Sequence, residues 1–162
     1  MRMNKKNSVL ITLFLAIFLV LLSGTFFMLR YNLGMPSRDA LPSGKSSVVV
    51  GESVFTVDIA ETSALREQGL SGRVALPEKG GMLFVFDKPI IEHFWMKDMN
   101  FPIDIVWIGD DMHVVDLSEH LTPESYPKIF SPRVPARYVL EIGYGVVARE
   151  KIKIGDAVEI LR

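Results

Sequence analysis

The sequence predicts a β-rich α+β fold: a compact single-domain, barrel- or sandwich-like mixed sheet with one or two short helices, preceded by a transmembrane helix. Three observations lead to this prediction. Residues 47–162 contain many short apolar segments separated by Gly and Pro, only brief stretches favour a helix, and residues 9–29 form one apolar run. Short strands at close spacing, with turn signals between them, are typical of a small barrel or sandwich.

The apolar run from Val9 to Leu29 predicts the transmembrane anchor. No charged residue interrupts it. A helix of this length, rising about 1.5 Å per residue, covers roughly 30 Å, the thickness of a bilayer's hydrocarbon core. A cleaved signal peptide is the alternative, but its apolar region is usually about 7–15 residues long and ends at a small-residue cleavage site. Here Ser23-Gly24-Thr25 is followed by further apolar residues, so we expect an uncleaved anchor in contact with the lipid bilayer.

The charges that flank this run predict its orientation. Arg2, Lys5 and Lys6 lie close together in residues 1–8, whereas the basic residues after the run are more thinly spaced. The tighter cluster is expected to stay in the cytoplasm. We therefore predict a single-pass plasma-membrane protein with a cytoplasmic basic tail (1–8), an anchor (9–29), a linker rich in Gly, Pro, Ser and Asn (30–46), and a domain on the outer face (47–162).

The composition of the predicted domain excludes several function classes. Residues 47–162 carry twelve Lys and Arg against eighteen Asp and Glu, a net charge of −6. Such a domain has no electrostatic attraction to a phosphate backbone, so we expect no nucleic-acid partner. The chain has no Cys, which excludes disulfides, thiol catalysis, iron–sulfur clusters and thiolate zinc sites. We expect no cofactor.

The first elements of the domain follow from local patterns. Val48–Val50 and Val54–Ile59 are predicted strands around a turn at Gly51, and Phe55, Val57 and Ile59 share one face of the second strand. Thr62 is a suitable N-cap for a short helix from Ser63 to Gln68 that ends at Gly69.

The remaining elements are predicted to be mostly strands. Gly109-Asp110-Asp111 indicates a hairpin turn, and residues 118–136, which contain four prolines, are predicted to form a long ordered loop. The expected strands are Met82–Phe86, Ile91–Met96 after a break at Pro89, Ile103–Ile108, Met112–Leu117, Arg137–Ile142 and Ala157–Leu161.

No catalytic template fits the sequence. Glu92-His93 and Glu119-His120 resemble parts of a metalloprotease motif, but neither has the second His at the required spacing. There is no Gly-x-Ser-x-Gly elbow and no glycine-rich phosphate loop. Paired carboxylates remain open because they meet in space and not in sequence. The sequence therefore leans against an enzyme without deciding the question.

Two acidic residues stand in strands that are otherwise apolar. Asp104 shares its side of the 103–108 strand with Val106 and Ile108, and Glu141 lies within Tyr138–Ile142. A buried carboxylate needs a cationic or hydrogen-bonding partner, and we consider Lys97, Arg66 and Arg137 for Asp104. A structural buried pair is favoured over a reactive carboxylate at both positions.

The spacing of His93, Met96 and Met99 raises a copper hypothesis, since imidazole and thioether ligands suit that metal. On a strand, however, Met96 would face away from the other two, and Met often fills irregular cores. A core role is therefore favoured. Trp95 and Trp107 are also more often core residues than ligand platforms, although an exposed Trp95 would suit stacking on a sugar or a peptide.

Six sequence blocks occur in a fixed order along the predicted domain: Gly69–Arg73, Gly81–Phe86, Phe94–Met99, Pro102–Ile105, Tyr138–Glu141 and Lys153–Asp156. Together they resemble the family known as domain of unknown function 192. The resemblance spans nearly all of residues 50–160 and implies a compact β-rich domain, often exported or anchored, with no established activity. The family pattern usually has Met where Ser71 stands, and often Asn-Thr where Asp98-Met99 stand. The residues on family-pattern positions are Arg66, Trp95, Met96, Lys97, Asp104 and Glu141.

These observations lead to one main hypothesis and two alternatives. The main one is a non-enzymatic, extracytoplasmic binding or accessory module for a small-molecule, glycan or protein ligand. The first alternative is a carboxylate-dependent hydrolase acting on cell-envelope material, which would use Asp104 and a second carboxylate. The second is a soft-metal protein that uses His93, Met96 and Met99. The candidate ligand-binding residues are Arg66, Trp95, Lys97, Asp104 and Glu141.

Overall fold

The computed structural model describes residues 46–161. The predicted tail and anchor, and the predicted linker up to residue 45, lie outside these residues. Within the described part of the chain, neither α-helix has the length and apolar character needed to cross a membrane.

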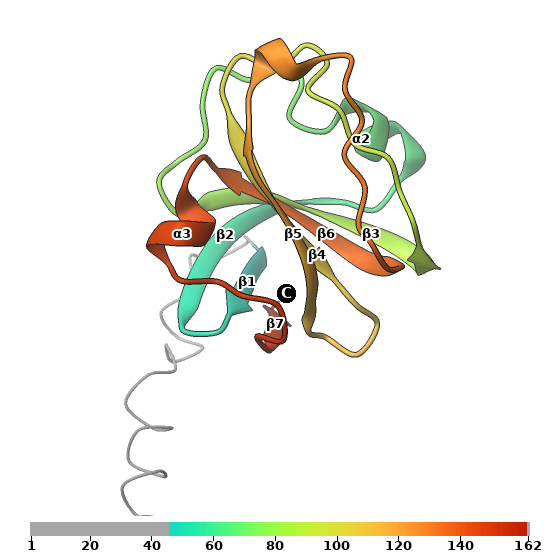
Figure 1. Cartoon of the computed structure of the whole chain (residues 1–162), viewed down its shortest axis with the longest axis vertical. Coiled ribbons are helices and arrows are strands. Elements are labelled where there is room, and N and C mark those ends of the chain that lie inside the picture. Colours follow the sequence, from blue (N-terminus) through green and yellow to red (C-terminus); the bar gives the residue numbers. More distant parts are fainter. Residues whose placement is uncertain (1–45, 162) are drawn as a thin grey trace, which may run out of the picture. The chain divides into compact units, whose positions relative to one another are not determined.

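The domain is built on one seven-stranded mixed sheet (Figure 1). Its strands follow the order β5-β4-β6-β3-β2-β1-β7. Only β2 and β3 are parallel, and the other neighbours are antiparallel. The strands are β1 (Ser46–Val50), β2 (Ser53–Ala60), β3 (Gly80–Ile90), β4 (Ile103–Ile108), β5 (Val114–Leu121), β6 (Ala136–Gly143) and β7 (Val158–Leu161).

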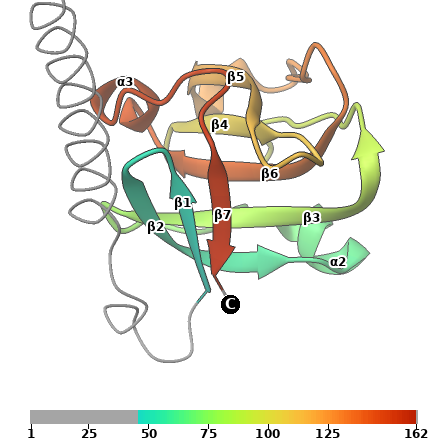
Figure 2. The same ribbon diagram turned by 90° about the horizontal axis from the view of Figure 1, so that it is seen from below.

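The sheet curls into a half-barrel because its two ends meet at one point. His113, just before β5, forms a β-bridge with Ala157, just before β7. The Val158 N–H also donates to the Met112 carbonyl at 2.8 Å. In Figure 2 the β7 end of the sheet accordingly passes across β6 and β3. The predicted mixed sheet is confirmed, and of the two architectures expected, barrel-like or sandwich-like, the structure has a half-barrel.

The two faces of the curled sheet carry separate apolar cores. The inner core contains Phe55, Leu83, Val106 and Leu140, with contributions from every strand. The outer core lies on the opposite face of β3, β6 and β4 and includes Phe84 and Trp107. Segments outside the sheet cover this outer face through apolar side chains, namely Leu70, Met96, Phe101 and Phe130.

Two short helices accompany the sheet, in agreement with the prediction. α2 (Ser63–Gln68) begins after Thr62, whose Oγ accepts a hydrogen bond from the Leu65 N–H at 3.3 Å. It ends at Gly69, where φ is +51°, a conformation that glycine adopts most readily. α3 (Val146–Arg149) is a single turn after β6, and it buries Val146 and Val147 in the inner core.

The predicted strand at Ile91–Met96 is wrong. β3 continues through Pro89 to Ile90, and the following segment is irregular apart from a bridge between Phe94 and Phe130. The physical reason is aromatic packing across the sheet. Phe94 contacts Phe84 and Trp107 edge-to-face, with ring centroids 4.9 and 5.4 Å apart. The segment therefore lies over the outer face and does not join the sheet.

The predicted loop over residues 118–136 is wrong in its first residues. β5 continues to Leu121, which pairs with Ile103, and a short 3₁₀ turn at Pro123–Ser125 follows. The register shifts between Ser118 and Leu121, so this strand bulges opposite Asp104. Its residue His120 has a positive φ of 60°.

Asp104 occupies the inner face of β4 and is sealed from solvent. Its partners are backbone groups and not the cations considered from sequence. The His120 N–H donates to Oδ1 at 2.9 Å, and the Val147 N–H donates to Oδ2 at 3.0 Å. Arg137 instead pairs with Asp110. The Asp104 carboxyl group therefore joins the β5 bulge to α3, a structural role.

We predict that Asp104→Asn destabilises the domain by about 2 kcal/mol, because the amide cannot accept from both backbone N–H groups. Asp87→Asn, at an exposed position of β3, is the matched control and should cost less than about 0.5 kcal/mol. Denaturant unfolding of both variants measures the difference. Equal stability of the two variants would contradict the structural role of Asp104.

Candidate functional site

A cleft of about 310 Å³ lies over the outer face of β3 and β6. One wall is formed by α2 and the turn that follows it, and the other by residues 92–99. The volume is at the small end of the range for small-molecule sites. The cleft is lined by Arg66, Glu67, Gln68, Gly69, Leu70, Ser71, Phe84, Phe86, Glu92, His93, Phe94, Trp95, Met99 and Glu141.

The two walls are fastened to each other by three hydrogen bonds, which we call the clasp. The Gly72 N–H donates to the Asp98 carbonyl at 2.9 Å, and the Ser71 Oγ donates to the Lys97 carbonyl at 3.0 Å. The Asn100 side-chain amide donates to the Arg73 carbonyl at 2.9 Å. The clasp joins residues 71–73 to residues 97–100 and so sets the spacing of the cleft walls.

The two tryptophans have opposite environments. Trp107 is 0% exposed, and its indole Nε1 donates to the Ser118 Oγ at 3.0 Å. Trp95 is 52% exposed and lines the cleft. The neighbouring Phe94 packs between Phe84 and Trp107, so the segment is held while the indole of Trp95 stays accessible. The expectation that a Trp is more often a core residue holds for Trp107 and fails for Trp95.

Arg66 is held in place at the α2 wall. Its Nη1 donates to the Glu61 carbonyl at 2.8 Å and to the Val85 carbonyl at 2.9 Å. Its guanidinium carbon lies 5.1 Å from the centre of the Phe86 ring, a cation–π contact. These contacts join α2 to β3 and place a fixed positive charge beside the cleft.

Glu141 reaches the cleft from β6. In the sheet register it lies opposite Met82 of β3 and Ile105 of β4, on the outer face. The residue is 6% exposed, and its Oε2 is buried with no hydrogen-bond partner among the described residues. Burial raises the pKa of Glu141 to about 8, and the charge of Arg73 acts against this rise. At neutral pH the group is therefore mostly a neutral acid that can donate a hydrogen bond.

The structure brings together three of the five candidate residues: Arg66, Trp95 and Glu141. Asp104 is excluded by register, since Ile105 pairs with Glu141 while Asp104 pairs with Ile142 and faces the opposite side of the sheet. Lys97 has an exposed side chain and does not line the cleft. Its backbone carbonyl contributes to the clasp instead.

The copper ligands considered from sequence are separated by burial. His93 and Met99 line the cleft, whereas Met96 is packed in the outer core. The His93 Nδ1 lies 2.6 Å from the Ser131 Oγ and shares a hydrogen bond with it. Among residues 46–161, no group of three or more His, Cys, Asp or Glu side chains is placed to hold a metal ion.

Several cleft residues were not candidates from sequence. They are the acidic and amide side chains of Glu67, Gln68 and Glu92 and the phenyl rings of Phe84 and Phe86. The only sequence signal for these residues was the presence of two family-like blocks, Gly69–Arg73 and Phe94–Met99. The fold places these blocks on opposite walls of the cleft. Sequence alone does not show that these two blocks meet.

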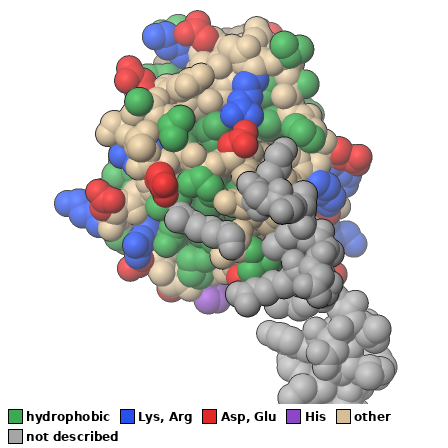
Figure 3. Space-filling model, turned by 180° about the vertical axis from the view of Figure 1, so that it is seen from behind, with side chains coloured by type: hydrophobic (Ala, Val, Ile, Leu, Met, Phe, Trp, Pro, Cys, Tyr) green, Lys and Arg blue, Asp and Glu red, His purple; other side chains and the backbone are tan. Residues whose placement is uncertain are grey.

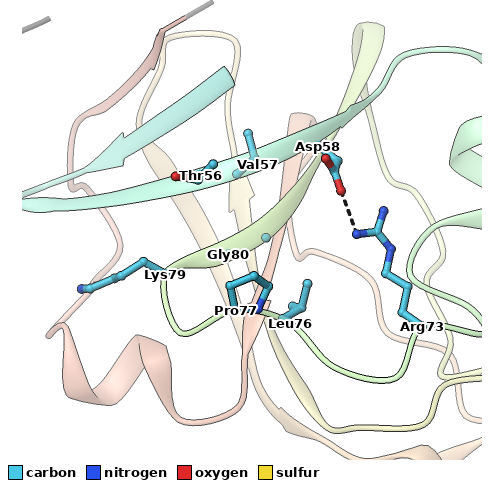
Figure 4. A pocket seen from close by; sticks show the side chains of 9 residues that line it. Thr56, Val57, Asp58, Arg73, Leu76, Pro77, Lys79 and Gly80 are labelled. Carbon is cyan, nitrogen blue, oxygen red and sulfur yellow. Dashed lines mark hydrogen bonds and ion pairs between the residues drawn. The ribbon is translucent and has the colours of Figure 1, made fainter. Parts of the chain in front are cut away.

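A second cavity of about 430 Å³ lies beside β2, and no candidate residue lines it (Figure 4). Its charged side chains already have partners. Arg73 reaches Asp58 at 2.7 Å, while Lys79 extends away from that pair and meets Glu150 at 2.6 Å. Although this cavity is larger, none of the described residues that line it has an unpaired buried polar atom, so the cleft at Glu141 is the stronger candidate site.

The charged side chains on the face opposite the view of Figure 1 are mixed. Figure 3 shows Lys and Arg beside Asp and Glu on this face, with hydrophobic and other side chains between them.

The order of the blocks and the fold lead to the comparison with known families. Residues 46–160 match DUF192, which is described as "Uncharacterized ACR". The chain belongs to this family. A comparison with curated proteins gives no match.

Two crystal structures resemble this DUF192 domain. One is a protein of unknown function from Novosphingobium aromaticivorans DSM 12444, with 34% identity and a TM-score of 0.67, covering 70% of this chain and 83% of the other. The second comes from Sinorhizobium meliloti 1021 and is described as a candidate transcription regulator. It has 31% identity and a TM-score of 0.66, covering 74% of this chain and 97% of the other.

We predict that Glu141 makes stability depend on pH. The pKa is raised from 4.5 in the unfolded chain to about 8 in the fold, so the folded state retains a proton that the unfolded state loses. The retained proton therefore stabilises the fold fully below pH 4.5. As the pH rises, the free energy of unfolding falls by at most about 1.4 kcal/mol per pH unit, and the stabilisation is lost as the pH approaches 8.

Denaturant unfolding at several pH values tests this effect. Glu141→Gln should gain stability relative to the wild type as the pH rises from 5 to 8, and the difference should then level off. Glu159→Gln, at an exposed position of β7, is the control. Parallel stability curves for Glu141→Gln and the wild type would show that Glu141 is ionised in the fold.

Proposed function

We propose that this protein is a membrane-tethered, extracytoplasmic binding module whose ligand site is the cleft between Arg66, Trp95 and Glu141. The observation that carries the proposal is the Oε2 atom of Glu141, which is buried at the cleft with no hydrogen-bond partner among residues 46–161. An unpaired buried polar group costs about 1–3 kcal/mol. A ligand that hydrogen-bonds this group would recover much of that cost.

The surroundings of Glu141 suit recognition better than core packing. The accessible indole of Trp95 offers a flat apolar surface, while Arg66 adds a fixed positive charge on the α2 wall. An apolar site with a few convergent polar groups is the usual form of a small-ligand pocket. Because the clasp fixes the distance between the walls, the cleft is preorganised for its ligand.

We do not propose the hydrolase or the copper alternative. The hydrolase would need Asp104 at an open cleft with a second carboxylate, but Asp104 is buried on the opposite face of the sheet from Glu141. The copper alternative would need Met96 to be accessible, and Met96 is packed in the outer core.

We do not propose a role in transcription for this chain, although the Sinorhizobium meliloti protein is described as a candidate transcription regulator. The α-helices in residues 46–161 are six and four residues long, too short to serve as a recognition helix in a major groove. The net charge of −6 over residues 47–162 also opposes binding to phosphate groups.

The tether in this proposal rests on the apolar run Val9–Leu29 and the basic cluster before it. We predict that the full chain stays in the membrane fraction after alkaline carbonate extraction and is not shortened at its N-terminus. Deletion of residues 9–29 should release the domain into the soluble fraction. Carbonate-soluble wild-type protein, or a mature N-terminus after residue 22, would contradict the tether.

The cleft is tested by a thermal-shift screen of the full-length protein with soluble fragments from cell-envelope digests. We predict a ligand that raises the Tm of the wild type and whose affinity falls about tenfold or more in Trp95→Ala, because stacking on the indole is lost. Tyr144→Ala removes an aromatic side chain of similar exposure, 50%, that does not line the cleft, so this variant should bind normally. Equal binding by both variants would place the ligand elsewhere.

A further inference from the structure

We infer that the cleft binds a glycan with N-acetylated hexosamine units, stacked on Trp95 and hydrogen-bonded through an acetamido carbonyl to Glu141. This inference rests on the proposed binding function and specifies the class of its ligand. It follows from the three kinds of contact that the cleft offers together: an accessible indole, a buried hydrogen-bond donor, and apolar side chains next to that donor.

The accessible indole favours a flat ligand with one apolar side. A pyranose ring has such a side, formed by its axial C–H groups, and a half-exposed Trp presents a matching surface at low entropic cost. Trp95 is held by its neighbour Phe94, whose ring is packed on two other aromatic rings. The backbone that carries the indole is therefore held in place before a ligand binds.

The donor at Glu141 favours an amide carbonyl as its acceptor. In its neutral form this carboxyl group donates one O–H, and its Oε2 has no partner in the described part of the chain. An acetamido group brings a strong acceptor and a methyl group on the same carbon. Leu70, Phe84 and Met99 line the same cleft and supply apolar surface for that methyl group.

The charges around the cleft disfavour an anionic ligand. Glu67 and Glu92 line the walls, against the single guanidinium of Arg66, which already donates to two carbonyls. A neutral sugar can hydrogen-bond such carboxylates through its hydroxyl groups, whereas a carboxylated ligand would be repelled by them. The side chains of Gln68 and His93 add further polar contacts.

A peptide is a poorer fit at this wall. An extended peptide usually binds by pairing with an open strand. Beside Trp95, however, the Phe94 N–H donates to the Phe130 carbonyl at 2.9 Å, and the Phe130 N–H donates back at 2.8 Å. The backbone at Phe94 is thus already paired, and recognition there must use side chains.

The experiment uses the full-length protein in a zwitterionic detergent without a sugar headgroup, with tri-N-acetylchitotriose as the probe. The chain has two Trp residues, and only Trp95 is accessible in the domain, so intrinsic fluorescence reports on the cleft. We expect a saturable change in Trp emission below about 1 mM probe. Trp95→Phe, which keeps a ring, should confirm the source of the signal.

Variants at Glu141 test the hydrogen bond. Glu141→Gln keeps a donor and should bind the probe within about threefold of the wild type at pH 6. Glu141→Met has a similar volume and no donor, so it should bind at least tenfold more weakly. Wild-type affinity should fall as the pH rises above 8, and Glu141→Gln should lack this fall. Melting temperatures of both variants verify that they are folded.

Two further probes separate the possible outcomes. Maltotriose lacks the acetamido group and should bind at least tenfold more weakly than tri-N-acetylchitotriose; equal binding would overturn the role of the acetamido carbonyl. A soluble disaccharide muropeptide carries the same acetamido groups but adds peptide carboxylates, so it should bind more weakly than tri-N-acetylchitotriose; tighter binding would overturn the argument that the charges of the cleft disfavour an anionic ligand.

Triglycine separates this inference from the proposed function. If triglycine, or another non-sugar ligand from the envelope screen, changes Trp95 emission while the sugars do not, the glycan assignment is wrong and the binding function stands. If no probe and no screened fragment changes Trp95 emission or Tm, both are wrong.

Discussion

The register between β4 and β6 determines on which side of the sheet each buried acidic side chain lies. Ile105 pairs with Glu141, and Asp104 pairs with Ile142. Since side chains alternate along a strand, this single alignment places Asp104 in the inner core and Glu141 on the outer face. A shift of one residue would pair Asp104 with Glu141 and put both carboxyl groups on the same face of the sheet. The two acidic groups thus have separate roles because of backbone pairing, although both lie in apolar strands.

The outer face becomes a site because segments outside the sheet cover it incompletely. Phe94, Met96 and Phe130 cover the part over Trp107. The clasp then holds residues 71–73 against residues 97–100, and beside it a gap remains over Glu141, between α2 and residues 92–95. Asp98, at the centre of the clasp, has a positive φ of 55°, a conformation that Asp and Asn tolerate better than most residues.

Local chemistry was sufficient to predict the elements that depend on local interactions. The Thr62 cap, the Gly69 stop and the 103–108 strand follow from short-range patterns, and the structure has them. The 91–96 segment could not be predicted in this way. Its alternating apolar residues are those of a strand, but the ring contacts of Phe94 with Phe84 and Trp107 override that preference.

The candidate site was predictable only in part, for a related reason. Arg66, Trp95 and Glu141 could be chosen as candidates because they lie on family-pattern positions. The partners of a buried group, in contrast, depend on the tertiary fold. Asp104 illustrates this limit. The backbone N–H groups of His120 and Val147 satisfy it, and main-chain donors have no signature in the side-chain sequence. Nor does sequence show that Glu141 lacks such donors.

The position of β1 has a mechanical consequence. This first strand of the domain is not at an edge, because β2 pairs with it on one side and β7 on the other. Ser47 lies opposite both Thr56 and Leu161. A pulling force applied to the chain at Ser46 would therefore load two ladders of hydrogen bonds together. The strand that would receive tension from a tether is thus supported on both sides, and the domain would resist being peeled open from that end.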